Sequence, residues 1–206
     1  MKISLTKAGK RYNRDWIFRN LSYQFVSGTG YAIVGPNGSG KSTLLQAIAG
    51  SLVLSEGSIE YHHSNNSSIE PTEIFRSLAI SAPYLELIEE MTVTEFLSFH
   101  STFKPFLQSH SIAQIISLVG LNESAGKQIR YYSSGMKQRV KLAQAVFSDV
   151  PLILLDEPCT NLDSSGIELY KTLISDFAAD RLIIVSSNDE NEYGFCSEKI
   201  NILSFK

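Results

Sequence analysis

A glycine-rich segment in the first quarter of the chain has the residue types needed to hold phosphate groups. Residues 35–42, Gly-Pro-Asn-Gly-Ser-Gly-Lys-Ser, match the pattern G-x-x-x-x-G-K-[ST]. Glycines in such a loop let successive backbone N–H groups converge on phosphate oxygens, and a helix beginning there points its positive end at the same charge. Lys41 adds a cation for the β and γ phosphates, and the Ser42 hydroxyl suits Mg²⁺.

The surroundings of this segment are the ones that the motif requires. An apolar run at residues 31–34 predicts a strand before it, and residues 41–49, closed by Gly50, predict a helix after it. A chance match in a chain of this length has a probability on the order of 1 in 100. We therefore predict a nucleotide site formed by Gly35, Pro36, Asn37, Gly38, Ser39, Gly40, Lys41, Ser42 and Thr43.

Two adjacent carboxylates form the second chemical group. Asp156 and Glu157 follow the apolar run 152–155, and ligands of α/β sheets bind at such strand ends. Alternation along a strand turns the two side chains to opposite sides. We predict Asp156 as a Mg²⁺ ligand and Glu157 as the base that activates or orients the attacking water. The alternative is an acidic turn after a core strand.

Composition and patterning indicate one α/β domain over residues 1–206. Strands are predicted at 2–6, 16–18, 21–26, 58–61, 152–155, 182–185 and 199–205, with helices between 92 and 121 and at 134–147 and 165–178. Alternating strands and helices imply a parallel sheet. The polar stretch 62–68 is a candidate hairpin tip.

Charge and hydropathy exclude several classes of protein. The formal charge of −3 provides no positive field for a nucleic acid, so no nucleic-acid partner is expected. No apolar run has the length of a membrane span or signal peptide, which predicts a cytoplasmic chain. We expect Cys159 and Cys196 to be free thiols. The four histidines, His62, His63, His100 and His110, are expected to be solvated, without a metal.

Four motifs in the right order resemble those of the nucleotide-binding subunits of ABC transporters, over essentially the whole chain. Residues 35–43 look like the Walker A motif of that family, and 152–158 look like Walker B with its catalytic glutamate. Residues 132–139 are similar to the signature motif and 160–163 to the D-loop. The resemblance implies an ABC ATPase: a P-loop NTPase core with a mostly parallel sheet, an N-terminal antiparallel β edge and a helical subdomain inserted at about 84–145.

The resemblance also implies ATP, Mg²⁺ and a dimer with itself or a homologous ATPase subunit. Each site would combine one chain's phosphate loop with the other chain's signature residues Ser133 and Gly135. Ser134 and the D-loop residue Asp163 are also expected to contact the nucleotide. Tyr12 lies where the family places a ring that stacks on adenine; a core tyrosine at a strand end is the alternative.

Three features depart from the family pattern: the signature motif, one glutamine and one histidine. The signature reads Tyr-Ser-Ser-Gly-Met instead of Leu-Ser-Gly-Gly-Gln, and the place of the glutamine that contacts Mg²⁺ and water falls at Pro83. Asn188 stands where the family has a histidine. An asparagine amide donates a hydrogen bond, but unlike a histidine it cannot take up a proton and become positively charged. Asn188 is therefore predicted as a partial catalytic substitute.

These features predict an ATP-hydrolysing transporter subunit that lies against the inner face of the membrane and drives a separate transmembrane permease. Its length and signature resemble compact ATPases of haem-exporter or drug-exporter type. One alternative is a nucleotide-binding structural partner with little hydrolysis, because Pro83 and Asn188 remove two usual side chains. Another is a soluble ABC-type ATPase acting on DNA or ribosomes. Glu86, Glu89 and Glu90 form either a solvated acidic turn or a docking surface for a membrane partner.

Overall fold

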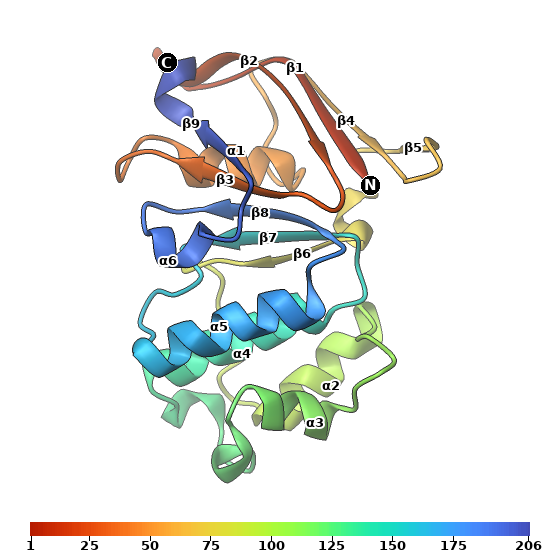
Figure 1. Ribbon diagram of the computed structural model, residues 1–206, viewed down its shortest axis with the longest axis vertical. Coiled ribbons are helices and arrows are strands. Elements are labelled where there is room, and N and C mark those ends of the chain that lie inside the picture. The colour runs from red at the N-terminus through yellow and green to blue at the C-terminus, as the bar shows by residue number, and fades with distance from the viewer.

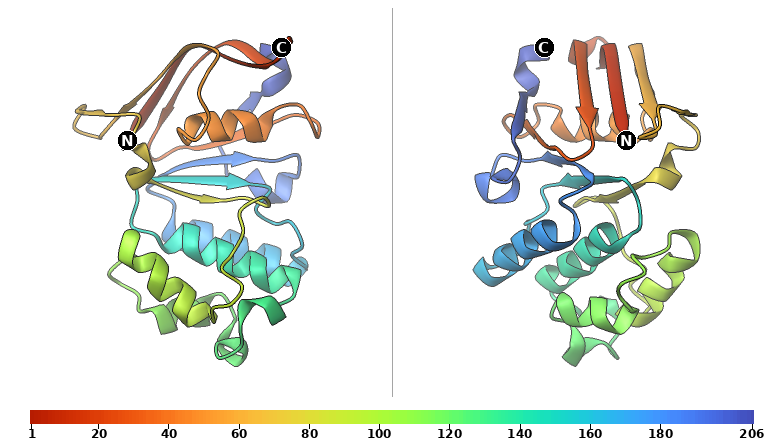
Figure 2. Two further views of the ribbon diagram at one scale, coloured as in Figure 1. Left: turned by 180° about the vertical axis from the view of Figure 1, so that it is seen from behind. Right: turned by 45° about the vertical axis from the view of Figure 1, so that its right-hand side comes forward.

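The computed structural model describes residues 1–206 and stacks their elements in layers (Figure 1). An antiparallel sheet lies at one end, followed by helix α1 and a parallel sheet. Two long helices cover the far face of the parallel sheet, and two shorter helices lie beyond them, as the view from behind in Figure 2 also shows. These helices are α1 (Lys41–Ile48), α4 (Ser134–Phe147), α5 (Ser164–Phe177), α2 (Val93–Phe103) and α3 (Ile112–Leu118).

The parallel sheet has the strand order β6-β7-β8-β3-β9, and every neighbouring pair runs parallel. Its strands are β3 (Gly30–Val34), β6 (Leu78–Ser81), β7 (Leu152–Asp156), β8 (Leu182–Ser186) and β9 (Glu198–Asn201). All residues of β7 and β8 are buried, as expected for strands covered on both faces. The order brings the carboxyl ends of β3, β7 and β8 side by side, which is where the predicted chemical groups follow.

The antiparallel sheet has the order β2-β1-β4-β5 and confirms the predicted N-terminal β edge. Its strands are β1 (Lys2–Tyr12), β2 (Asp15–Val26), β4 (Glu56–His62) and β5 (Ser68–Ile69). The predicted hairpin tip lies between β4 and β5. Ile3 and Leu5 of β1 are buried while Ser4 is only partly so, because side chains alternate across a strand.

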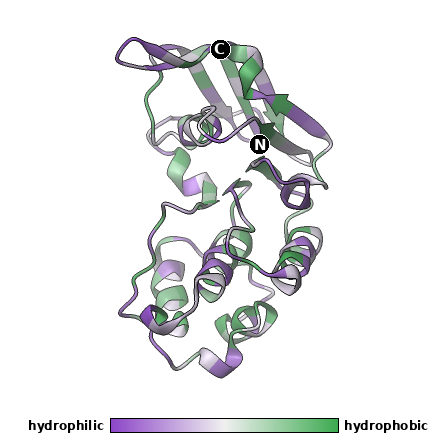
Figure 3. Ribbon diagram, turned by 90° about the vertical axis from the view of Figure 1, so that its left-hand side faces the viewer, coloured by the Kyte–Doolittle hydropathy of each residue, from purple (hydrophilic) through white to green (hydrophobic).

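Two hydrophobic clusters occupy the two sides of the parallel sheet. One joins the antiparallel sheet, α1 and one face of the parallel sheet; Phe18, Phe25 and Leu44 belong to it. The other joins the opposite face to α2, α3, α4 and α5; Phe147 and Tyr170 belong to it. Hydrophobic and hydrophilic residues alternate along the helices in Figure 3, as amphipathic packing requires. Because the helical layer shares its core with the sheet, the subdomain boundary at about 84–145 stays a prediction.

The helices α2 and α3 begin at capping boxes. The Thr92 hydroxyl accepts a hydrogen bond from the Glu95 N–H, and the Glu95 carboxylate accepts one from the Thr92 N–H. Ser111 and Gln114 make the same reciprocal pair at α3. Such caps stabilise a helix by about 1 kcal/mol. The remaining helices are short: η1 (Ile74–Ser77), η2 (Asn122–Ser124), η3 (Ile129–Tyr131), α6 (Glu190–Tyr193) and η4 (Ile202–Phe205).

The structure corrects the predicted last strand and the predicted histidine environments. The strand ends at Asn201, whose side chain accepts a hydrogen bond from the Leu203 N–H and starts η4. His100 is bonded to the Ser148 hydroxyl at 2.9 Å, and burial lowers its pKa to about 4. The ring of His110 packs against two phenylalanine rings, Phe147 and Phe177. Neither imidazole is fully solvated, although no cluster of potential metal ligands exists.

Two further findings bear on the sequence predictions, one about the cysteines and one about membrane-spanning helices. Both cysteines are free, as predicted, and both are buried. None of the helices combines the length and hydropathy of a membrane span.

Candidate nucleotide-binding site

The phosphate loop connects β3 to α1, as the motif requires. It forms a cavity of about 200 Å³ together with Ile17 and Glu157. The Lys41 side chain is buried, and its amine donates to the backbone carbonyls of Gly35 at 2.9 Å and Pro36 at 3.3 Å. This geometry holds the ammonium group across the loop, where it is available to an incoming phosphate.

Gly40 precedes α1 and lets the loop close against the antiparallel sheet. Its φ of 106° lies in the left-handed region, and a Cβ atom there would come within 2.3 Å of Ile17 Cγ2. Ile17 is therefore part of the wall of the site. Sequence reasoning missed it, because one isoleucine in a β-rich segment carries no signal of its own.

Asp156 ends β7 with a buried carboxylate whose Oδ1 atom has no hydrogen-bond partner. A buried, unpaired carboxylate oxygen is costly unless a ligand satisfies it. With the Ser42 hydroxyl at the start of α1, it makes an all-oxygen donor set, the chemistry that Mg²⁺ prefers. These residues fit the predicted metal.

Glu157 leaves the strand in an unusual conformation. Its φ is 44°, which is uncommon for a residue other than glycine, and its N–H donates to the Ser186 carbonyl of β8 at 2.9 Å. The half-buried side chain lines the phosphate-loop cavity and also a neighbouring cavity of about 370 Å³. Asp156 and Glu157 are therefore placed in different surroundings, as the division of roles requires.

Asn188 follows β8 and reaches the phosphate loop directly. Its amide donates to the Asn37 side-chain oxygen at 2.7 Å, although 151 residues separate the two. Asn37 and Glu157 line both cavities, and Asn188 lines the larger one. The structure thus brings the predicted base, the predicted substitute for the histidine and the phosphate loop together.

The segment after β6 carries a residue that the sequence reasoning did not single out. The side chain of Pro83 offers no donor, and the Lys141 amine binds its carbonyl at 3.1 Å. The next residue is Tyr84, whose side chain is partly exposed. Burial raises the pKa of Tyr84, and the negative charge of Asp156 adds to this rise. The predicted place of the family's glutamine stays at Pro83, and Tyr84 is the residue beside it.

The signature residues begin helix α4. Ser133 is its N-cap, and the Ser133 hydroxyl accepts a hydrogen bond from the Met136 N–H at 3.2 Å. A Cβ atom on Gly135 would lie 3.0 Å from the Asn161 carbonyl, so glycine permits the close approach of the next loop. Ser133 and Ser134 are exposed.

The remaining predicted site residues lie outside both cavities of this single chain. Asp163 caps α5, where its carboxylate accepts from the Gly166 N–H at 2.8 Å. Tyr12 ends β1 with 47% of its surface exposed, which contradicts the alternative of a core tyrosine. Tyr12, Asp163 and the signature residues thus line neither of the two cavities, and their contacts with nucleotide stay predictions.

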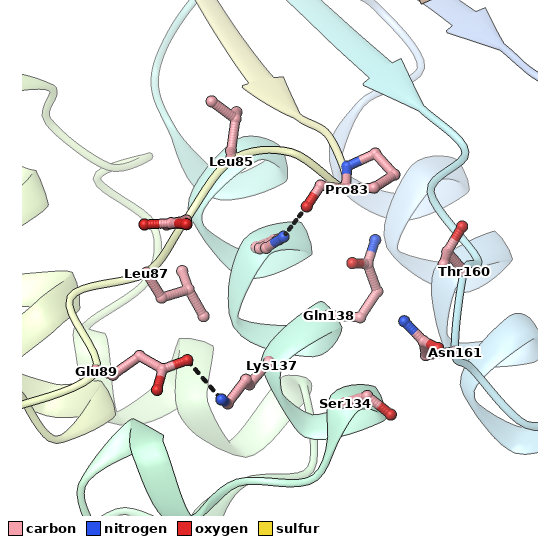
Figure 4. A pocket seen from close by; sticks show the side chains of 11 residues that line it. Pro83, Leu85, Leu87, Glu89, Ser134, Lys137, Gln138, Thr160 and Asn161 are labelled. Atoms are coloured by element: carbon pink, nitrogen blue, oxygen red, sulfur yellow. Dashed lines mark hydrogen bonds and ion pairs between the residues drawn. The ribbon is translucent and has the colours of Figure 1, made fainter. Parts of the chain in front are cut away.

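The acidic segment 86–90 is partly tied to the helical layer. Glu89 pairs with Lys137 at 2.5 Å and Glu90 with Arg130 at 3.1 Å. Beside it lies a cavity of about 380 Å³ between the Pro83 segment, helix α4 and the loop at Thr160 and Asn161 (Figure 4).

Comparisons with known proteins agree with this geometry. The profile of a family described as ABC transporter matches residues 18–160. An uncharacterized ABC transporter ATP-binding protein of Bacillus subtilis, YybJ, is 30% identical over 195 residues, which cover 92% of this chain and 87% of YybJ. The cytochrome c biogenesis ATP-binding export protein CcmA of Xylella fastidiosa is 34% identical over 164 residues, or 79% of this chain and 72% of CcmA.

A solved structure shows the same fold. The dimeric structure of a bacterial ABC transporter cassette superimposes with a TM-score of 0.81 at 23% identity, covering 97% of this chain and 94% of the cassette. At this identity the likeness concerns the fold alone.

Proposed function

Because the chain belongs to the ABC transporter family of ATP-binding proteins, we propose that it binds and hydrolyses Mg²⁺-ATP as one half of a dimer. The observation that carries this proposal is the position of Glu157, which lines the phosphate-loop cavity together with Lys41 and the adjoining cavity together with Asn188. A carboxylate at this point can accept a proton from water beside the last phosphate.

Each residue has a role that its geometry supports. The Lys41 amine exchanges the carbonyls of Gly35 and Pro36 for phosphate oxygens, which carry full negative charge and bind it more strongly. Ser42 and Asp156 would hold the metal ion, which neutralises charge on the phosphates and orients them. Asn188 donates its amide to a γ-phosphate oxygen after releasing Asn37.

The exposed start of helix α4 supports the proposed dimer. Ser134 and Gly135, the first residues of this 14-residue helix, do not line the chain's own phosphate-loop cavity. A helix N-terminus favours anions, so a second copy would present it to the γ phosphate across the interface. The cassette with the same fold is dimeric.

We further propose a separate membrane partner, as in the transporter relatives. Helix α2 exposes two aromatic side chains, Phe99 and Phe103, whose rings meet edge to face with centroids 5.1 Å apart. The short helix η1 exposes a third ring, Phe75, which is 55% exposed. Exposed rings of this kind suit an apolar contact. Purification from detergent-solubilised membranes tests this: a stoichiometric membrane-spanning polypeptide supports the partner, and a chain that remains entirely in the soluble fraction with ATP contradicts it.

We expect Asn188→Ala to lower the rate of phosphate release about tenfold or more relative to the wild type. The Asn188 amide stands at the place of the missing histidine and bonds the phosphate loop, and losing one preorganised donor costs up to about 10²- to 10³-fold in other enzymes. Wild-type hydrolysis should itself be slow, because an amide supplies no positive charge. Phosphate release at saturating Mg²⁺-ATP measures both rates.

Asn65→Ala is the matched control, because Asn65 is exposed in the loop between β4 and β5. Equal rates for wild type and Asn188→Ala would show that Asn188 takes no part. Absence of release from the wild type above a Glu157→Gln background would instead favour a nucleotide-binding structural partner.

A further inference from the structure

Glu192 is a buried carboxylate close to the site. It belongs to the short helix α6, only 5% of its surface is exposed, and its carboxylate accepts a hydrogen bond from the Cys159 N–H at 2.7 Å. Cys159 lies in the loop that runs from Glu157 to helix α5. A buried carboxylate needs such partners, because burial without them is costly.

Helix α4, which begins at the signature residues, also holds this loop. The Gln138 side chain of α4 donates to the Pro158 carbonyl at 2.7 Å, and this contact is also buried (Figure 4 shows Gln138 facing the loop at Thr160). Adjacent residues of the loop, Pro158 and Cys159, are thus bound by two different elements. The backbone directly after Glu157 is therefore fixed by two side chains, Gln138 and Glu192.

Glu192 also connects this loop to the segment that carries Asn188. Its own N–H donates to the Asp189 carbonyl at 3.0 Å, and Asp189, the residue after Asn188, is the N-cap of helix α6. The phenol of Tyr170, fully buried on α5, donates to the Glu192 carbonyl at 2.7 Å. The side chain and backbone of one residue therefore join the Glu157 loop, the Asn188 segment and α5.

The charges around Glu192 do not suggest a structural ion pair. Burial raises the pKa of Glu192, and the negative charges of Asp189 and Glu157 raise it further. Hydrogen bonds from the Ser187 hydroxyl and the Cys159 N–H lower it. No Lys or Arg partner is present among its contacts, so what Glu192 contributes is an acceptor at a defined distance.

We propose that Glu192 is a positioning residue for hydrolysis, which aligns Glu157 and Asn188 through its hydrogen bond to the Cys159 N–H. This inference rests on the proposed hydrolysis. ATP binding does not depend on it, because Glu192 does not line the phosphate-loop cavity.

Two substitutions separate the reach of this side chain from its charge. Glu192→Gln keeps the length and an acceptor oxygen but removes the charge. Glu192→Asp keeps the charge but is shorter by one C–C bond, about 1.5 Å, and no longer reaches the Cys159 N–H. Glu190→Asp is the matched control on the same helix, because the Glu190 side chain is 77% exposed and pairs only with Lys199.

We expect Glu192→Gln to retain kcat within about threefold of the wild type. Glu192→Asp should lower kcat about 10- to 100-fold with KM for ATP unchanged, since misplacing a reacting group by about 1 Å has effects of this size. Amide hydrogen exchange of the segment 158–163 should quicken in Glu192→Asp and stay unchanged in Glu192→Gln and Glu190→Asp.

Wild-type kcat and exchange in Glu192→Asp would overturn the proposal, as would equal losses of kcat in the two Glu192 variants. A rise in KM without a fall in kcat would also overturn it. If the wild type released no phosphate, the proposed function would fail by itself. Amide exchange would then still show whether Glu192 holds the loop.

Discussion

Replacing Lys41 with alanine is expected to abolish detectable ATP binding while the fold stays intact. Lys41 supplies the only side-chain cation in the phosphate-loop cavity. Hydrogen bonds to charged groups contribute about 1.5 to 3 kcal/mol each, so losing two weakens binding by a factor of about 10² or more. Titration of the folded variant with ATP measures the change. Melting with and without ATP adds a second readout, because a ligand that binds the folded chain raises its stability.

Lys171→Ala provides the control for the Lys41 variant. Lys171 lies on α5 in an exposed pair with Glu168, away from the phosphate loop, and its loss should leave ATP affinity and the ATP-induced rise in melting temperature unchanged. Wild-type ATP affinity in folded Lys41→Ala would contradict the assignment of the site.

Glu157→Gln is expected to retain ATP, lose hydrolysis and accumulate a closed dimer. The amide has the size of the carboxylate but cannot accept the proton of the attacking water, and general bases contribute about 10²- to 10⁴-fold to rates. ATP that is bound and not hydrolysed holds the two halves together, since it binds only the closed form tightly. Phosphate release gives the rate, and light scattering with Mg²⁺-ATP gives the mass.

Glu168→Gln is the corresponding control, because the Glu168 side chain is 72% exposed on α5. It should hydrolyse at the wild-type rate and show the wild-type mass. A Glu157→Gln variant that hydrolyses at the wild-type rate, or that stays monomeric under every nucleotide condition, contradicts the role of Glu157.

The phosphate loop and the carboxylate pair could be predicted from sequence because their chemistry is local. The loop needs its glycines and Lys41 within eight residues, and Asp156 directly follows a run of buried strand residues. Strand, loop and helix are then recognisable without tertiary information. The capping boxes at Thr92 and Ser111 similarly mark where two helices begin.

Contacts between distant segments could not be predicted in this way. Asn188 and Asn37 meet only because β8 and β3 are neighbours in the sheet. Glu192 follows Asp189 and Glu190, so the sequence resembles a solvated acidic helix, and only the fold buries it. His100 was misjudged for the same reason, since packing against Ser148 removes a helix-surface imidazole from water.

The predicted last strand shows the limit of a pattern that is read residue by residue. Residues 199–205 alternate well enough for a strand, yet the Asn201 side chain competes for the backbone N–H of Leu203 and turns the chain into η4. A polar side chain at a strand end thus changes the structure of the residues that follow it.

Phosphate release by the purified wild-type chain, measured with Mg²⁺-ATP over a range of protein concentrations, tests the central claim most directly. If two copies form each site, the rate per chain rises with protein concentration as dimers form, requires Mg²⁺ and falls to background in Glu157→Gln. The claim is contradicted if no release exceeds that background. A rate per chain that stays constant where gel filtration shows only single chains would equally contradict it.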